Sequence, residues 1–415
     1  MFLSTIVLAA VMLFGTEGCK KDSTPTALTL TTLSAGVVDL NGAVAATTVP
    51  TTTTIVAGFA ADIDAATATP ANITMTRDYD NAAVPITITV ATNTITIVPT
   101  EVLASGALYK LAFGAGIKST DAQPLAAVNR NFTTTGTFAP SGMIAYWKFE
   151  DNATDQVGTF TPTAGGIKNM TFTTSRNAAA GKAATFNGTT SFIEIPNGNQ
   201  LMNTTNFTLC FWVKANSTDK TSGHFVMGLA GWNGFQFEIF GDYKGCKLAA
   251  QYDLGTGLST SEDLWFNGGA TGTTKDNGGF QGWTFCKDLT GTGDLAFLIK
   301  DKWAHIVCVY NAATKVGTMY INGEKMKSQD FKLWPVGDAK LGVVGLKYAG
   351  TALGNQLAFG YIQGSTNRAI TDTWADPTNP DPTLNHFKGQ LDDVRIYHKA
   401  LTAAEIDLMY KSEKP

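Results

Sequence analysis

The chain has 415 residues, which is enough for two or three domains of ordinary size. Only 15% of its residues are charged, 42 are glycines, and the formal net charge is -4 with no run of basic residues. Nucleic acid is therefore not expected as a partner, because phosphate binding needs clustered lysine and arginine. The balance of few charges, many glycines and 10% aromatic residues is typical of secreted all-β proteins.

The N-terminus is organised like an export signal. The apolar run from Phe2 to Phe14 is too short to span a bilayer and has the dimensions of a signal peptide. Cys19 follows at the place where a bacterial lipoprotein signal is cut and the new N-terminal cysteine is acylated. Thr16 and Glu17 depart from the usual residues before such a cysteine, and no Lys or Arg precedes the apolar run. The alternative is a secreted protein without lipid.

The segment that starts at Cys19, CKKDSTP, resembles the start of many Bacteroidetes lipoproteins, in which Lys and Asp residues after the cysteine accompany surface export. The resemblance implies a lipid-anchored protein at the outer membrane or cell surface, with the lipid as its only membrane contact. The sequence thus predicts a signal peptide over residues 1–18 and a lipidated N-terminus over residues 19–24.

Four further cysteines lie in the second half of the chain. An oxidising location permits disulfides, and four cysteines allow three pairings, between which the sequence does not choose. Buried free thiols are the equal alternative. A zinc site is not indicated, because no CxxC or Cys–His cluster occurs. The four are Cys210, Cys246, Cys286 and Cys308.

Residues 25–136 contain short runs of alternating apolar and polar residues, bounded by Pro, Asn, Asp and Gly. Examples are ITMT (73–76), ITITV (86–90) and YKLAF (109–113). This period of two at short, regular spacing predicts an antiparallel β-sandwich.

The order of features in this segment is more specific than its periodicity. An F…IDxxT strand, a P…L…Y corner and a terminal FTT strand follow one another, and this order resembles the bacterial Ig-like domains of the SbsA type. The resemblance implies that Tyr109 packs its ring at a corner while its hydroxyl bonds to nearby backbone. Residues 137–142, rich in Pro and Gly within GTFAPSG, are predicted to be a linker.

The rest of the chain, residues 143–415, predicts a second sandwich. MIAYWKFED (143–151) reads as an opening strand, and FKGQLDDVRIY (387–397) as a closing strand that should pair with it. Between them lie FNGTTSFIEIP (186–196), FTLCFWVKA (207–215) and KWAHIVCVYNAATKVGTMYINGEKM (302–326). This order resembles a laminin G-like domain with the concanavalin A-like fold, in the form common in bacterial surface proteins. The resemblance extends from Met143 to about Tyr410.

The predicted fold class is all-β: an N-terminal Ig-like sandwich, then a concanavalin A-like jelly-roll sandwich with one short terminal helix. Local sequence signals agree with this prediction. Asn322-Gly323 predicts a type I′ hairpin turn. Thr402, with a glutamate three residues later, predicts a capping box for a helix over residues 400–410. Framework positions, and therefore packed cores, are predicted for Trp147, Trp212 and Trp303.

A calcium site is one interpretation of the acidic residues near the two terminal strands. Hard carboxylate oxygens suit Ca²⁺, and laminin G-like domains often carry this ion, as the resemblance implies. Successive strand residues point to opposite faces, so Asp392 and Asp393 are not expected to share one ligand, and one of them should pair with a base such as Arg395. The alternative is that these acids cap turns and face solvent. The candidate calcium ligands are Glu150, Asp155, Asp392 and Asp393.

Two long connections, 223–300 and 334–374, are rich in aromatic residues among glycines. A flat aromatic ring beside amide groups is the usual chemistry for a sugar, whose C–H face stacks while its hydroxyls form hydrogen bonds. The alternative is that the rings only cover the sheet. The candidate glycan-binding residues are Trp232, Trp265, Trp283, Trp334, Trp374, Asn233 and Gln281.

Catalysis has little support, although concanavalin A-like folds also include glycoside hydrolases, which resemble one another in an ExDxxE strand. The near match EIDLMY (405–410) lacks the last glutamate and falls in the predicted helix, and no catalytic residue is predicted. The predicted function is capture of a glycan or polysaccharide by the C-terminal sandwich, with the Ig-like domain as a spacer. A protein-binding adhesion module is the alternative, and a glycoside hydrolase or lyase comes third.

Overall fold

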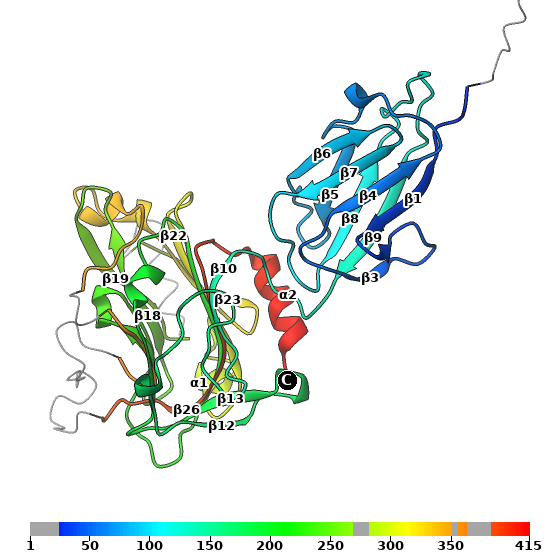
Figure 1. Ribbon diagram of the computed structural model, residues 1–415. Helices are drawn as coiled ribbons and strands as arrows, with labels where there is room; N and C mark the ends of the chain where they lie inside the picture. Colours follow the sequence, from blue (N-terminus) through cyan, green and yellow to red (C-terminus); the bar gives the residue numbers. More distant parts are fainter. Residues whose placement is uncertain (1–24, 269–281, 351–354, 363–382) are drawn as a thin grey trace, which may run out of the picture.

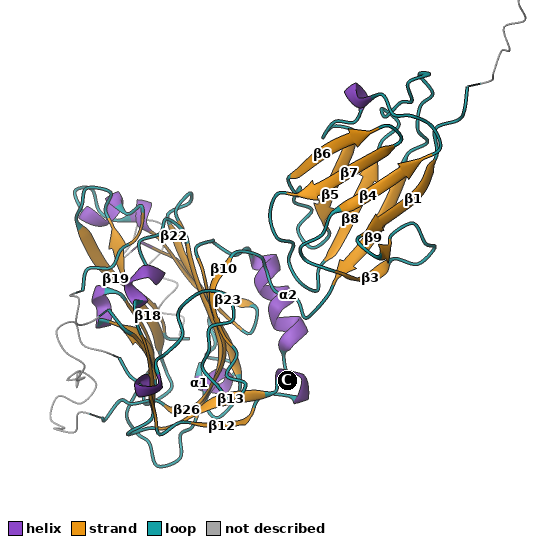
Figure 2. Cartoon of the chain, in the orientation of Figure 1, coloured by secondary structure: helices purple, strands orange, loops and turns teal. Residues whose placement is uncertain are grey.

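The computed structural model describes residues 25–268, 282–350, 355–362 and 383–415, and it consists of two β-sandwiches joined in sequence (Figure 1). Strands are the main regular elements of both units, and one helix of several turns, α2 (Ala403–Glu413), closes the chain (Figure 2). In this part of the chain no helix has the length and apolar character needed to cross a membrane.

The first sandwich packs a five-stranded sheet against a four-stranded one. The five-stranded sheet runs in the order β2 (Val38–Asp39), β1 (Leu30–Ala35), β4 (Ile55–Phe59), β7 (Thr94–Pro99) and β6 (Ile86–Ala91). The four-stranded sheet runs in the order β3 (Ala46–Val49), β9 (Val128–Thr134), β8 (Leu108–Phe113) and β5 (Ile73–Arg77). Alternation sets the faces: Ile95 and Ile97 of β7 are buried, whereas the threonines beside them are half-buried.

Tyr109 on β8 has the predicted corner role. Its ring stacks on Phe132 with the ring centroids 5.4 Å apart, and its hydroxyl accepts a hydrogen bond from the backbone N–H of Ala104 at 2.8 Å. The hydroxyl therefore satisfies a buried backbone donor that would otherwise be costly.

The second sandwich packs a nine-stranded sheet against an eight-stranded one. The strands of the first sheet, in spatial order, are β12 (Thr171–Thr174), β13 (Lys182–Asn187), β26 (Lys388–Tyr397), β15 (Phe207–Ala215), β21 (Ala304–Asn311), β22 (Val316–Ile321), β23 (Glu324–Asp330) and β20 (Trp283–Cys286), with β10 (Met143–Trp147) on β26. Those of the second are β11 (Ile167–Lys168), β14 (Phe192–Ile195), β25 (Leu357–Phe359), β16 (His224–Leu229), β17 (Phe235–Ile239), β18 (Cys246–Asp253) and β19 (Ser259–Phe266), with β24 (Gly345–Leu346) on β18.

The predicted pairing of the opening and closing strands is confirmed: β10 lies antiparallel to β26, with Tyr146 opposite Arg395. The predicted hairpin is also present, since Asn322 and Gly323 join β22 to β23 with φ of 54° and 78°. Trp147 and Trp212 are fully buried as expected, whereas Trp303 is half-buried.

Helix α2 begins with the predicted capping box, in which the Thr402 side chain accepts from the Glu405 N–H and the Glu405 side chain accepts from the Thr402 N–H. It starts and ends one turn later than the sequence suggested. The helix lies between the two sandwiches (Figure 1). The Tyr79 hydroxyl of the first sandwich donates to the Glu405 carboxylate at 3.4 Å, and Ile406 and Met409 are buried in an apolar cluster shared by both units.

The four cysteines of the second sandwich are free thiols and all are buried. Cys210 lies with its Sγ 3.0 Å from Nε2 of His305, and burial raises the pKa of this thiol to about 12. Of the two alternatives left open by the sequence, the structure therefore has buried thiols.

Candidate functional site

The closing strand β26 contains a β-bulge at its two adjacent carboxylates. The register against β15 shifts between Cys210–Arg395 and Trp212–Asp392, and Asp393 has a φ of 47°. A bulge interrupts the alternation of side chains. Both carboxylates consequently reach the same guanidinium, that of Arg176, at 2.6 Å from Asp392 and 2.5 Å from Asp393.

The prediction that these two aspartates serve different partners was therefore wrong, because it assumed an unbroken strand. It was right only in that Asp393 also approaches Arg395, at 3.3 Å. Arg176 itself was missed by the sequence reasoning, since an isolated arginine in TTSRNAAA shows no pattern that points to a site.

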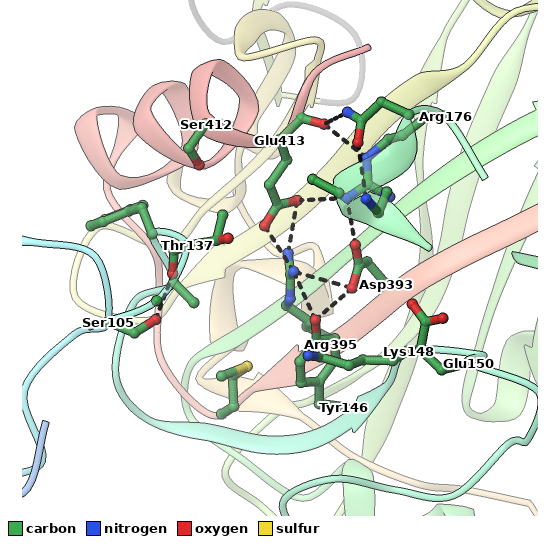
Figure 3. Close-up of a pocket in the computed structure, with 17 residues that line it drawn as sticks. Ser105, Thr137, Tyr146, Lys148, Glu150, Arg176, Asp393, Arg395, Ser412 and Glu413 are labelled. Atoms are coloured by element: carbon green, nitrogen blue, oxygen red, sulfur yellow. Dashed lines mark hydrogen bonds and ion pairs between the residues drawn. The ribbon is translucent and has the colours of Figure 1, made fainter. Parts of the chain in front are cut away.

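The network extends from the sheet to the end of helix α2 (Figure 3). Arg176 Nε donates to the carbonyl oxygen of Glu413 at 2.8 Å, and Arg395 forms an ion pair with the Glu413 carboxylate at 2.8 Å. The Trp212 indole N–H donates to the same carboxylate at 2.9 Å, and the Tyr146 hydroxyl donates to Asp393 at 2.5 Å. These contacts fix the last turn of α2 on the outer face of the nine-stranded sheet.

Burial and nearby charges give the two neighbouring carboxyls different pKa values. Burial, and then the charge of Asp393, raise the pKa of Asp392 to about 8. Burial also acts on Asp393, but the guanidinium charges of Arg395 and Arg176 outweigh it and hold the pKa of this carboxyl below its usual value. Three carboxyls and two guanidiniums meet here, so one bound proton makes the network neutral.

A cavity of about 300 Å³ lies over this network, between the two sandwiches (Figure 3). Ser105 and Thr137 line it from the first unit, and Lys148 lies at its exposed rim. The charged groups of its floor are already engaged with one another, and only Arg395 Nε is without a partner. This network of ion pairs joins helix α2 to the sheet. We infer that it stabilises the fold and is not a ligand-binding site.

The four candidate calcium ligands do not come together. Asp155 accepts hydrogen bonds from the backbone N–H groups of Tyr146, Val157, Gly158 and Phe160, so it holds a turn. Glu150 accepts from the Lys182 N–H at 3.1 Å, and Asp392 and Asp393 bind arginines. Within the described ranges no group of three His, Cys, Asp or Glu residues could hold a metal. With these partners the four carboxylates do not form a calcium site, and calcium binding by the chain stays a prediction.

Three of the candidate tryptophans gather where the edges of the two sheets meet. The rings of Trp265 on β19 and Trp283 on β20 lie 5.8 Å apart at an angle of 55°. A Cβ atom added to Gly282 would lie 3.4 Å from Nε1 of Trp334, so the third indole lies beside the residue that precedes Trp283. We call Trp265, Trp283 and Trp334 the tryptophan edge.

Several buried polar atoms at the tryptophan edge have no hydrogen-bond partner. They are Nε1 of Trp265, Nε1 of Trp334, and both side-chain polar atoms of Gln329, which lies opposite Trp283 on β23. Lys327 on the same strand places Nζ 3.5 Å from the centroid of the Trp283 ring. Buried polar groups are rarely left unpaired, and such a concentration marks a place where a ligand can bind.

The remaining glycan candidates are not assembled with these. Asn233 lies in the turn between β16 and β17, where its carbonyl oxygen accepts from the Ala349 N–H at 2.7 Å. The backbone of Trp232 lies in the same turn, and its side chain is outside what the structure describes. Trp374 and Gln281 also lie outside the described residues. Lys327 and Gln329 were missed, because EKMKSQD reads as an ordinary strand.

Comparison with protein families identifies both units. Residues 31–134 match the model of a bacterial Ig-like domain, and residues 187–353 match the concanavalin A-like lectin/glucanases superfamily, in its laminin G form. The chain thus carries a bacterial Ig-like domain followed by a concanavalin A-like domain, and the predicted architecture is confirmed. The comparison with curated proteins found no match.

Among solved structures the chain is similar to clostridial toxin domains. The binding domain of Paraclostridial Mosquitocidal Protein 1 is 16% identical with a TM-score of 0.41, over 65% of this chain and 52% of that one. The ligand binding domain of botulinum neurotoxin serotype D, in complex with N-acetylneuraminic acid, is 16% identical with a TM-score of 0.39. The match covers 65% of this chain and 50% of that one. The botulinum neurotoxin type G receptor binding domain is 17% identical with a TM-score of 0.37. The match covers 65% of this chain and 51% of that one. The chain spans about half the length of these proteins, and such distant likeness says nothing of their ligands here.

Proposed function

We propose that the concanavalin A-like domain binds carbohydrate at the tryptophan edge. The observation that carries this proposal is that Trp265, Trp283 and Trp334 come together beside unpaired polar groups. Indole rings stack on the C–H face of a sugar, and unpaired indole N–H and amide groups can bond to its hydroxyls. A glycan would therefore satisfy both the apolar and the polar parts of this edge.

The proposal is for binding without catalysis. A glycoside hydrolase needs two carboxyl groups free to act as acid and as base or nucleophile. The carboxylates nearest to Trp265 along β19 are already engaged: Asp263 pairs with Lys247 at 3.0 Å, and Glu262 pairs with Lys340 at 3.2 Å. Both are thus better suited to holding the edge in place than to transferring a proton.

A glycan array followed by calorimetry on the best oligosaccharide tests this proposal. Trp283→Ala is expected to weaken binding about tenfold or more, since an aromatic contact worth about 1.5 kcal/mol is lost. Trp265→Ala removes a half-buried ring from the neighbouring strand and should weaken binding at a smaller cost to the fold.

Phe285→Ala is the matched control, because Phe285 lies on the same strand as Trp283, is 38% exposed and pairs with Ser328 instead of Gln329. This change is expected to leave the affinity unaltered. Wild-type affinity in both tryptophan variants, or a blank array, would contradict carbohydrate binding at this edge. A blank array would favour the protein-binding alternative.

We also propose that the chain is a lipoprotein of the outer membrane or cell surface, anchored through Cys19. The support is the sequence that begins CKKDSTP. Cys19 lies outside the described residues, and β1 of the Ig-like domain begins at Leu30. This domain would act as the spacer between lipid and glycan-binding domain.

Metabolic labelling with a palmitate analogue in a bacterial host tests the anchor. The wild-type chain should incorporate the label and sediment with membranes, whereas Cys19→Ser should lose both properties. Cys286→Ser, which alters a buried thiol of the second sandwich, is the control and should keep the label. Lipid labelling of the Cys19→Ser chain, or none in the wild type, would contradict the anchor.

A further inference from the structure

Lys327 and Gln329 form a polar pair between the two sheets of the concanavalin A-like domain. They are two residues apart on β23, so their side chains share one face. Lys327 lies opposite Met319 on β22 and Cys286 on β20, and both of these belong to the apolar core. The ammonium and the amide therefore point inward, toward the eight-stranded sheet.

Both side chains are buried and lack a polar partner. Lys327 is 1% exposed and Gln329 is 0% exposed. Throughout the described residues no carboxylate lies within ion-pair distance of Lys327, and neither polar atom of the Gln329 side chain has a hydrogen bond. An unpaired ammonium in such surroundings is costly, and burial lowers the pKa of Lys327 to about 8.

The partner that Lys327 does have is the face of an indole. Its Nζ lies 3.5 Å from the centroid of the Trp283 ring, which in turn packs 5.8 Å from Trp265. β19 and β20 are the last described strands of their sheets, so this cluster lies where the edges of the two sheets approach each other. Trp265 and Trp334 are half-buried and connect it to the surface.

We propose that the tryptophan edge selects an acidic sugar, whose carboxylate or sulfate group pairs with Lys327. Gln329 bonds to a neighbouring hydroxyl or ring oxygen, and the Trp283 ring stacks on the sugar. This inference rests on the proposed carbohydrate function and names its ligand class. A neutral sugar would leave the buried ammonium unpaired, whereas an anionic group supplies the missing countercharge, so the difference in affinity arises from Lys327.

Neighbouring lysines do not offer the same charge. Lys340 lies 4.4 Å from the centroid of the Trp334 ring, but its ammonium is paired with Glu262 at 3.2 Å. Lys247, cross-strand from Trp265, is paired with Asp263 at 3.0 Å. These two charges are compensated within the protein, so among the lysines described around the edge Lys327 is the one without a carboxylate partner.

The test measures binding of the whole chain to matched oligosaccharides by calorimetry. The probes are tetragalacturonate, its fully methyl-esterified form, which has the same rings without charge, and a sulfated galactan tetrasaccharide. The wild-type chain is expected to bind an acidic probe at least tenfold more tightly than the neutral ester. The carboxylate and sulfate probes distinguish the two sources of the anionic group.

Lys327→Met is expected to abolish this preference, so that acid and ester bind this variant with equal affinity. Methionine has a similar length and removes an unpaired buried charge, so this variant should melt at or above the wild-type temperature. Lys325→Met is the control: Lys325 is exposed on the same strand, with Nζ 4.9 Å from the centroid of the Phe285 ring. It should keep the preference for acid.

Equal binding of acid and ester by the wild type, or a preference that survives Lys327→Met, would overturn this inference while carbohydrate binding stands. Loss of all binding in Trp283→Ala with equal binding of acid and ester by the wild type would place carbohydrate binding at the edge without selection for charge. If neither acidic nor neutral oligosaccharides bind, the proposed function itself fails.

Discussion

Replacing Arg176 by methionine is expected to lower the free energy of unfolding by about 3–5 kcal/mol. The Arg176 side chain is 3% exposed and holds Asp392, Asp393 and the last turn of α2 at once. Its removal leaves the Asp393 carboxylate and the neighbouring Asp392 carboxyl buried with only the Arg395 guanidinium nearby. Chemical denaturation followed by tryptophan fluorescence measures the loss.

Lys182→Met is the matched control for this experiment. Lys182 also pairs with an aspartate at 2.6 Å, but both it and Asp151 are largely exposed. Exposed pairs contribute about 0–1 kcal/mol, so the control should unfold almost as the wild type does. If Arg176→Met falls within 1 kcal/mol of the wild type, the network does not hold the helix.

Helix α2 makes this network important for both domains. Glu405 at its start contacts Tyr79 and lies 3.8 Å from Arg77 of the Ig-like domain, while Glu413 at its end is bound by Arg395 of the closing strand. The helix is thus secured at one end by each domain. Loosening its last turn should therefore weaken the contact between the two sandwiches as well as the second sandwich.

Much of the fold could be predicted, because its signals are local or repeat along the chain. Alternating runs gave the strands, Asn322-Gly323 gave a hairpin, and Thr402 gave the start of α2. The pairing of β10 with β26 spans almost the whole second domain, and it was reached through the order of its strand motifs.

The sites were harder to predict because they depend on geometry that no local pattern encodes. One bulge at Asp393 turned two aspartates toward Arg176, more than 200 residues earlier in the chain. The tryptophans were recognised as aromatic residues among glycines. That Trp265, Trp283 and Trp334 lie close together depends on how the sheet edges formed by β19 and β20 approach each other. Lys327 shows the same difficulty, since burial, which a strand pattern does not reveal for a lysine, is what makes it unusual.

The contribution of Asp392 to stability is expected to fall by about 2 kcal/mol between pH 6.5 and pH 8, because this carboxyl must ionise in its buried position. Its pKa is raised to about 8 in the folded chain, so its protonated form stabilises the fold fully below pH 4, and this contribution is lost as the pH rises toward 8. Asp393 has a lowered pKa and acts in the opposite sense, below pH 4.

Two buried histidines act in the opposite sense. Burial lowers the pKa of His224 and of His305 to about 3, so their contribution to stability grows as the pH rises through about 6.5 and levels off about one pH unit above it. The effect of Asp392 is therefore measured as a difference from a variant that keeps both histidines. The groups that face Asp392 or its network from the packed elements are Ser175, Arg176, Asp393, Arg395, Tyr146, Trp212, His305 and Glu413.

Asp392→Asn isolates the ionisation, because asparagine keeps the shape of the protonated carboxyl and does not titrate. Between about pH 6.5 and 8 the stability of the wild type should fall by about 2 kcal/mol relative to that of the variant, whatever the absolute stability of the variant. Asp155→Asn changes a carboxyl held by four backbone N–H groups and should keep the wild-type slope. Parallel curves for the wild type and Asp392→Asn would mean that Asp392 is already ionised at pH 6.5. Arg176 would then face two full negative charges, and the cost of its removal would exceed the expected range.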